Sequence, residues 1–401
     1  MNKFMNTIFL GVLTTAILFS IDPLTHLTVT SKPSVVNKKL KDYSSEKIKL
    51  KPSKNILEKD FKINDTIREL SSLMCGDTTE SYKIFSSFSK KEDYLKITNS
   101  FSKDWGNLEN STLKKVKEFS NKNIYTGIDP KNVFYPFSGP DILFAHHFFN
   151  DARNFLLIGL EPCGSIPKFL KSPQPSYTEF KAYINQIHIA LQEITHYSFF
   201  RTIDMSSELK NTYVDGTLHV ILFFLGKMHC TPVEIKNFNI SSSGEIQYSN
   251  NTFNGIEVTF LNTKKEICIV RYISANIDNS NLSRNSGLNK FINTAKIDVT
   301  YIKGASYLLH MDNFSTFRDF ILNQSPAILQ DDTGIPFRNF NKNWDFKLFG
   351  MYTKPISMFS YRYQNDLDSF YKKSNPTPLG FGLGYNFKNQ NSALIFAQKK
   401  H

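Results

Sequence analysis

Val133-Phe-Tyr-Pro-Phe-Ser-Gly-Pro-Asp141 and Asn154-Phe-Leu-Leu-Ile-Gly-Leu160 are two apolar stretches that lie thirteen residues apart in the chain. Short apolar runs that end at turn residues are typical of buried strands. Ser138, a glycine, Pro140 and an acid follow the first run, and we expect Ser138 to cap a helix that begins at Pro140. The order strand, helix, strand is the repeating unit of a parallel α/β sheet.

A similar unit recurs near the end of the chain. Residues 299–302 and 325–330 read as strands, and the turn Gly304-Ala-Ser306 follows the first of them. Both units end in acids, Glu161 in the first and Asp331-Asp332 in the second. We interpret the pair as a duplicated βαβ element, and chance similarity between two buried strands is the alternative.

The segments around these two units predict the fold class. Apolar helical stretches and alternating segments with Asn, Ser and Gly turns lie between the units. We expect an α/β domain over residues 128–401, with a mixed sheet covered by helices and a Rossmann-like element, after a helical region over 61–127. The further predicted elements are helices at 177–200 and 218–228, antiparallel strands at 233–240, 256–260 and 266–273, and strands at 381–385 and 393–396.

The first sixty residues predict export from the cell. Lys3 precedes an uncharged apolar stretch, Ile8 to Phe19, so residues 1–21 resemble a signal peptide or a short anchor. Residues 22–60 form a linker whose part from residue 31 holds nine lysines against four acids. Such a basic linker can contact anionic headgroups. We therefore expect a periplasmic or extracellular protein, with membrane anchoring by the N-terminal segment as the alternative.

The composition excludes several classes of protein. Of 401 residues, 40% are hydrophobic and 21% charged, which is too apolar for a disordered chain, and the 36 Phe, 18 Tyr and 2 Trp make it rich in aromatic residues. The net charge of +12 is spread thinly outside the linker, so nucleic acid is not an expected partner. The four cysteines form no CxxC pair and the nine histidines form no zinc motif, so we predict no metal site. Disulfides and buried free thiols are equally compatible with the cysteines.

Acids at strand ends are the candidate functional residues, because α/β proteins gather their sites there. A hydrolase would use Asp141 and Glu161 as general acid and base. Arg201 and Asp204 stand three apart beside aromatic residues and could hold an anionic ligand. The full ligand-binding set is Ser138, Gly139, Arg201, Asp204, Asp331 and Asp332.

Three functions remain open at this point. The first is binding of a polar or anionic ligand of the cell envelope, and the second is hydrolysis by paired carboxylates. The third is a degenerate methyltransferase or Rossmann-like domain, because Glu161 follows Gly139 at about the spacing of a ribose-binding acid. We predict no cofactor, since the turn holds a single glycine and Pro140 lacks an N–H donor.

Several motifs also resemble those of a family of uncharacterised exported bacterial proteins. The resemblance covers about residues 128–397 and implies a protein of the bacterial envelope. It transfers no activity, cofactor or catalytic residue to any position. The motifs that carry it are Phe134-Tyr-Pro-Phe-Ser-Gly-Pro-Asp141, Gly159-Leu-Glu-Pro162, Phe200-Arg-Thr202 with Asp204-Met205, Ala305-Ser-Tyr-Leu308 and Gln330-Asp-Asp-Thr-Gly-Ile-Pro336.

Overall fold

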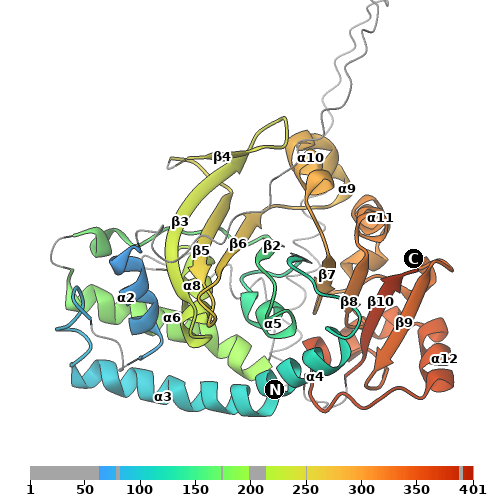
Figure 1. Ribbon diagram of the computed structural model, residues 1–401, viewed down its shortest axis with the longest axis horizontal. Helices are drawn as coiled ribbons and strands as arrows, with labels where there is room; N and C mark the ends of the chain where they lie inside the picture. Colours follow the sequence, from blue (N-terminus) through green and yellow to red (C-terminus); the bar gives the residue numbers. More distant parts are fainter. Residues whose placement is uncertain are drawn as a thin grey trace, which may run out of the picture. The chain divides into compact units, whose positions relative to one another are not determined.

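A ten-stranded mixed sheet forms the centre of the structure, a computed structural model (Figure 1). The residues that it describes are 63–77, 82–172, 175–197, 214–249, 251–387 and 392–400. They belong to one of two compact units of the chain, and the other unit, residues 1–57, lies outside them. The predicted signal segment 1–21 and linker 22–60 therefore lie outside the described residues.

The strands of the sheet run in the order β4-β3-β5-β6-β2-β1-β7-β8-β10-β9. The central five, β6 to β8, are all parallel, whereas the strands at both edges pair antiparallel. Numbered along the chain, the parallel strands have the order 3-2-1-4-5, as in a Rossmann-type sheet. The strands are β1 (Asn132–Pro136), β2 (Asn154–Gly159), β3 (Thr231–Ile240), β4 (Ile246–Tyr248), β5 (Gly255–Leu261), β6 (Ile267–Ser274), β7 (Val299–Ile302), β8 (Ala327–Gln330), β9 (Trp344–Phe349) and β10 (Leu394–Lys399).

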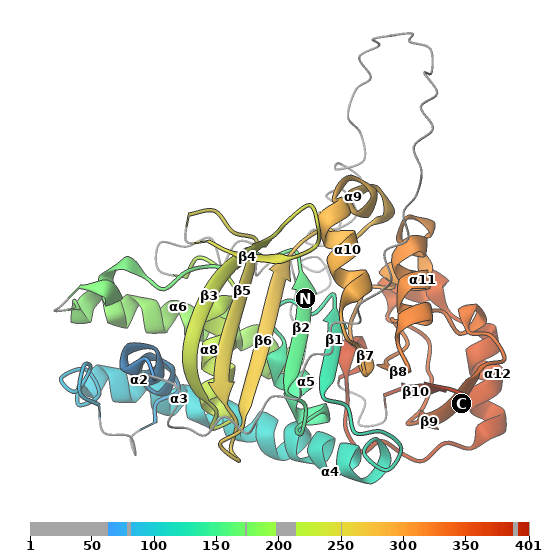
Figure 2. The same ribbon diagram turned by 45° about the horizontal axis from the view of Figure 1, so that its top comes forward.

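Helices cover both faces of the sheet (Figure 2). One face packs on α2 (Asp65–Met74), α3 (Glu92–Leu108), α4 (Lys114–Asn123), α5 (Ile142–Phe148), α6 (Tyr177–Tyr197) and α8 (Leu218–Lys227). The other packs on α9 (Asn279–Arg284), α10 (Ser286–Thr294) and α11 (Ser315–Gln324), and α12 (Asn365–Ser374) packs on β9 and β10. The short helices are η2 (Glu109–Leu113), η3 (Lys168–Lys171), η4 (Leu308–His310), η5 (Asp312–Phe314), η6 (Phe337–Asn339), η7 (Ser357–Arg362) and η8 (Gly384–Asn386).

This architecture confirms the predicted α/β class with a mixed, helix-covered sheet. The two predicted βαβ units are present as β1-α5-β2 and β7-α11-β8, and each strand pair is parallel. Their helices lie on opposite faces of the sheet, because α5 belongs to one core cluster and α11 to the other. From β1, the chain adds β2 and β6 on one side of the sheet and β7 and β8 on the other. The boundary between β1 and β7 is therefore the topological switch point.

One strand prediction was wrong. Residues 381–385 form a loop that enters η8, because closely packed glycines turn the chain there. The segment 266–273 is the strand β6, which pairs antiparallel with β5 as predicted and also pairs parallel with β2. The described part of the predicted helical region 61–127 contains α2, η2, α3 and α4, which share a hydrophobic core with the sheet. None of the helices among the described residues combines the length and the apolar character that crossing a bilayer requires.

Candidate functional site

The carboxyl ends of the parallel strands bring most of the predicted site residues to one edge of the sheet. Because β1, β2, β7 and β8 are parallel, the residues that follow them, among them Asp141, Glu161, Lys303 and Asp331, share this edge. We call this edge the carboxyl rim. Ligands of open α/β sheets bind at such a rim next to the switch point.

Asp141 is held by donors from three parts of the chain. It is the N-cap of α5, and its Oδ1 accepts the N–H of Phe144 at 3.1 Å. Its Oδ2 accepts the hydroxyl of Tyr135 at 3.0 Å and pairs with Lys303 Nζ at 2.7 Å. The predicted cap, Ser138, instead donates its hydroxyl to the carbonyls of Gly139 and Ile158, so that prediction was wrong.

Lys303 follows β7 directly and bridges the switch point to Asp141 of the neighbouring unit. Both side chains are only 2% exposed, and the ammonium lies 3.5 Å from the centre of the Phe144 ring. Burial lowers the pKa of Lys303, while the charge and hydrogen bond of Asp141 oppose that shift. The ion pair therefore occupies the place where the crevice of this fold lies.

Asp331 and Asp332 continue the same cluster at the end of β8. Asp331 accepts the N–H of Gly304 at 2.8 Å and the N–H of Thr333 at 3.0 Å, and burial raises its pKa. Asp332 accepts the hydroxyl of Tyr307 at 2.5 Å. Burial and the charge of Asp331 raise the pKa of Asp332 to about 7. Perturbed carboxyls in a shared cluster are a mark of functional sites, though structural networks produce them as well.

The backbone around this cluster is strained. Phe137 after β1 has a φ of 59°, and Ser306 and Tyr307 after β7 have φ values of 51° and 56°. Residues other than glycine adopt this left-handed region at a cost of about 1–2 kcal/mol each. Such outliers gather at functional sites, where surrounding structure holds them in place.

A nucleotide cofactor, which the fold type implies, does not fit the described residues at β1 and β2. Glu161, the acid at the ribose-binding distance, is 1% exposed, and its Oε2 accepts the hydroxyl of Tyr272 at 3.2 Å. A Cβ on Gly159, at the end of β2, would lie 2.6 Å from Glu161 Oε2 and 3.0 Å from the Cα of Gly139. The acid is thus packed against the glycine turn on which a pyrophosphate would have to rest.

A second polar network was missed by the sequence reasoning. His219 of α8 contacts the Tyr183 hydroxyl at 2.8 Å and Asp215 Oδ1 at 2.9 Å, and Asp215 accepts both the N–H and the hydroxyl of Ser165 at 2.9 Å. Burial acts to raise the pKa of Asp215, but the hydrogen bonds from His219 and Ser165 outweigh it and lower that pKa. The spacing of Asp215 and His219, four residues apart at a helix start, was the signal available in the sequence.

The predicted site residues thus fall into three groups. Asp141, Asp331 and Asp332 belong to the charge cluster, whereas Ser138, Gly139 and Glu161 line the adjoining end of β1 and β2. Arg201 and Asp204 lie outside the described residues. Within the described ranges, no three histidine, cysteine or acidic side chains are grouped so as to hold a metal ion.

No protein-family model matches the chain, and no curated protein matches its sequence. One similar solved structure is the plantazolicin methyltransferase BpumL in complex with SAH, with a TM-score of 0.26 and 9% identity over 84% of this chain and 98% of that chain. Another is the same enzyme with a monoazolic desmethylPZN analog and SAH, with a TM-score of 0.26, 10% identity and the same coverage. Values this low say nothing about what this chain does.

Proposed function

We propose that this chain is an exported, non-catalytic binding protein for a polar or anionic ligand of the cell envelope. Its sheet has the strand order of a Rossmann-like domain. The proposal includes that this Rossmann-like domain is degenerate, in the sense that it no longer binds a nucleotide cofactor. The ligand would bind at the carboxyl rim, without a cofactor and without group transfer.

The observation that carries this proposal is the buried ion pair at the switch point. Lys303 and Asp141 are 2.7 Å apart and almost fully buried at the position where a Rossmann-like sheet binds its nucleotide. Breaking such a pair to admit a ligand would leave a charge buried without a partner, at a cost of about 3–5 kcal/mol. The binding free energy of a cofactor would have to offset this cost of breaking the ion pair.

Acid–base catalysis by Asp141 and Glu161 gains no support from their contacts. A general base needs an oxygen that can reach the proton of a substrate. Both oxygens of Asp141 already accept hydrogen bonds, and Glu161 is buried against Tyr272 and Gly139. Hydrolysis by this pair remains a prediction, and hydrolytic activity lost specifically in Glu161→Gln would favour it over binding alone.

Calorimetric titration tests the absence of cofactor binding. The full chain would be titrated with S-adenosylmethionine, S-adenosylhomocysteine and NAD, each up to about 1 mM. We expect no saturable heat from any of them. Saturable binding of one of these compounds would overturn the proposal and restore the methyltransferase-like or dinucleotide alternative.

Export is tested separately by the apolar N-terminal stretch. Leu13→Arg places a charge in its middle, whereas Leu24→Arg makes the same change beyond it. We expect the first variant to remain inside the cell and the second to be exported like the natural chain in a bacterial host. Equal distribution of both variants in the cell fractions would contradict export by this segment.

A further inference from the structure

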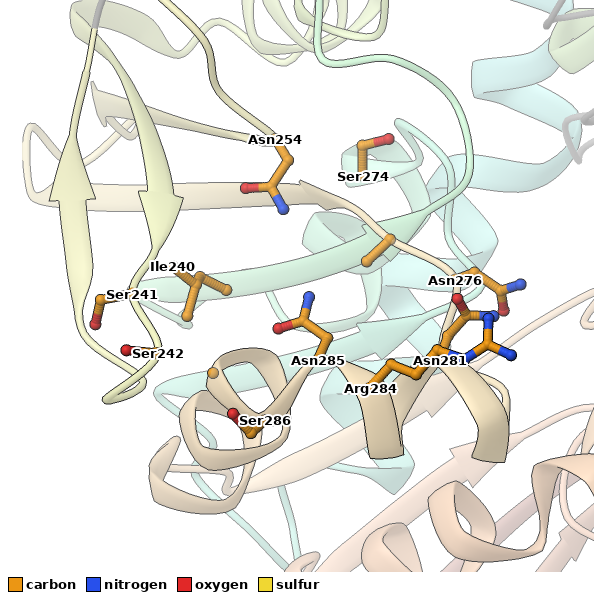
Figure 3. A pocket seen from close by; sticks show the side chains of 12 residues that line it. Ile240, Ser241, Ser242, Asn254, Ser274, Asn276, Asn281, Arg284, Asn285 and Ser286 are labelled. Carbon is orange, nitrogen blue, oxygen red and sulfur yellow. The ribbon is translucent and has the colours of Figure 1, made fainter. Parts of the chain in front are cut away.

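A polar cavity lies at the carboxyl rim beside β6 (Figure 3). No residue of the charge cluster lines it. Its volume is about 460 Å³, enough for a small ligand. The residues that line it are four serines, four asparagines, one arginine, one glycine, one isoleucine and one alanine, with no acid and no aromatic ring. Such a lining favours a ligand that is rich in hydrogen-bonding groups over an apolar or planar one.

Asn254 is held in place by its backbone, and its side-chain amide nitrogen points across this cavity toward Asn285 (Figure 3). Its backbone N–H donates to Asn239 Oδ1 at 3.1 Å, and its carbonyl accepts the N–H of Ser274 at 2.8 Å. Its side-chain Oδ1 is buried and has no hydrogen-bond partner among the described residues. Because that oxygen is buried, the group that Asn254 offers to a ligand is its amide nitrogen, a hydrogen-bond donor.

Asn285 faces Asn254 from the other side of the cavity (Figure 3). Its Oδ1 accepts the N–H of Leu288 and so caps α10. The capping bond fixes the side chain and leaves its amide nitrogen to donate to a ligand. The two amide nitrogens together therefore offer hydrogen-bond donors that suit neighbouring hydroxyl oxygens of a ligand.

Arg284 supplies the positive charge of the cavity at the end of α9. Its side chain is exposed and forms no ion pair with any described residue. The nearest acid in sequence, Asp278, accepts the side-chain amides of Asn276 and Asn281 and caps α9. Arginine without a carboxylate partner suits a carboxylate or phosphate, to which it can donate two parallel hydrogen bonds.

We propose that this cavity binds a saccharide that carries a single anionic group. The Asn254 and Asn285 amide nitrogens donate to hydroxyl oxygens of the sugar, and Arg284 binds the carboxylate or phosphate. This inference rests on the proposed binding function and gives it a site and a ligand class. The cavity lacks the aromatic platform that a neutral sugar would stack on, so the anionic group contributes a large share of the affinity.

Binding of small probes to the full chain tests this inference. Glucuronic acid, glucose 6-phosphate, glucose and inorganic phosphate would be titrated against the natural chain and followed by ligand-detected NMR. We expect the two acidic sugars to bind more tightly than glucose and more tightly than inorganic phosphate. The stronger of the two acidic sugars identifies the anionic group as carboxylate or phosphate.

Three variants assign the binding to the cavity. We expect Arg284→Ala to weaken binding of the acidic sugar about tenfold or more and to leave glucose unaffected, because only the acidic sugar forms a charge-assisted hydrogen bond with this side chain. Asn254→Ala should weaken every sugar. Arg338→Ala is the matched control, since Arg338 is also an exposed arginine without an ion pair among the described residues.

The other possible outcomes overturn either the cavity, the saccharide or the proposed function. Sugar binding that none of these variants changes would exclude this cavity and leave the proposed binding function standing. Equal binding of inorganic phosphate and of the acidic sugars would show that the site recognises only the anion. That result would overturn the proposal that the ligand is a saccharide. Failure of every probe to bind the folded chain would overturn the inference, whereas binding of S-adenosylmethionine or NAD would overturn the proposed function itself.

Discussion

A lysine inside a protein needs a partner that offsets the loss of its hydration. Lys303 has Asp141 at 2.7 Å and the face of Phe144 at 3.5 Å, and all of these groups are buried. The pair contributes little net stability by itself, because the desolvation of two charges cancels most of their attraction. Separating the two residues would leave each charge buried without a partner. The pair therefore holds the ends of β1 and β7 in place relative to each other.

Removal of one partner should therefore cost far more than removal of both. We expect Lys303→Met to lower the free energy of unfolding by about 3–5 kcal/mol, measured by urea denaturation. The double variant Lys303→Met with Asp141→Asn should recover much of the loss, because asparagine retains the helix cap without the charge. Lys372→Met breaks an exposed pair with Asp368 and should cost less than about 1 kcal/mol. A Lys303→Met variant as stable as Lys372→Met would show that the pair does not hold the rim together.

Asp332 should make the protein less stable as the pH rises. Its pKa is about 7 in the folded state and about 4 when unfolded, so between these values the folded state retains a proton that the unfolded state has lost. Stability from this group is present below about pH 4 and falls until the pH passes 7, by on the order of 2–4 kcal/mol.

Asp332→Asn should remove this loss, so that the difference in unfolding free energy between pH 5 and pH 8 shrinks. Asp345→Asn makes the same chemical change at an exposed aspartate, 72% accessible, and should leave the difference unchanged. An identical pH dependence in the natural chain and in Asp332→Asn would contradict the assignment.

The sequence predicted the acids of the cluster but not their partner. Asp141 and Asp331 could be nominated because each follows an apolar strand and the ends of parallel strands share an edge. Lys303 also follows a strand directly, yet the ion pair with Asp141 spans more than 150 positions and leaves no local pattern. The helix cap was misassigned because Ser138 and Asp141 are both good capping residues and only the backbone path chooses between them.

The loop from Phe381 to η8 closes over the carboxyl rim. Ser306 hydrogen-bonds the hydroxyl of Tyr385, and Gly384 lies against Asp331 with a φ of 54°. A Cβ at Gly384 would be 2.3 Å from Asp331 Oδ2, which is far inside van der Waals contact. The glycine is required both for its backbone conformation and for this close approach.

Gly384→Ala should consequently lower the free energy of unfolding by more than the cost of placing alanine in a left-handed backbone conformation, because the added Cβ also clashes with Asp331. Gly380→Ala is the control, because Gly380 has a φ of 79° but no atom within 4 Å of the added Cβ. We expect Gly380→Ala to cost about 1–2 kcal/mol and Gly384→Ala to cost clearly more, measured as thermal midpoints in the same buffer. Equal midpoints would mean that the loop moves away from Asp331 at little cost.

This loop also shows why one predicted element was wrong. Phe381-Gly-Leu-Gly-Tyr385 alternates large apolar residues with small ones, a pattern that resembles a half-buried strand. Gly382 instead packs so tightly against the Phe387 carbonyl that no side chain fits there. By contrast, the prediction of the strand at 299–302 was confirmed, because a run of apolar residues closed by a glycine turn has few other solutions.

The arrangement of strands across the whole sheet could not be read from the sequence. Local patterns predicted the two βαβ units, but not that β6 joins β2 in parallel or that β10 inserts between β8 and β9. These pairings depend on packing between segments that are far apart in the chain, for which a single sequence contains no direct signal. The polar cavity was missed for the same reason, since its lining comes from the β3–β5 edge, the end of β6 and two helices.

All four cysteines report on the stability of the whole molecule, because they are buried and free and lie in different parts of the fold. Burial raises the pKa values of Cys75, Cys163 and Cys230 to about 12 and that of Cys268 to about 11, so the reactive thiolate is scarce at neutral pH. We expect a thiol reagent to label none of them rapidly in the native protein and all four in denaturant. The rate of thiol labelling under native conditions should be higher in Lys303→Met. Labelling of a buried thiol requires unfolding, and this variant makes unfolding more frequent. A thermal midpoint that falls when reductant is added, or fewer than four reactive thiols in denaturant, would instead demonstrate a disulfide.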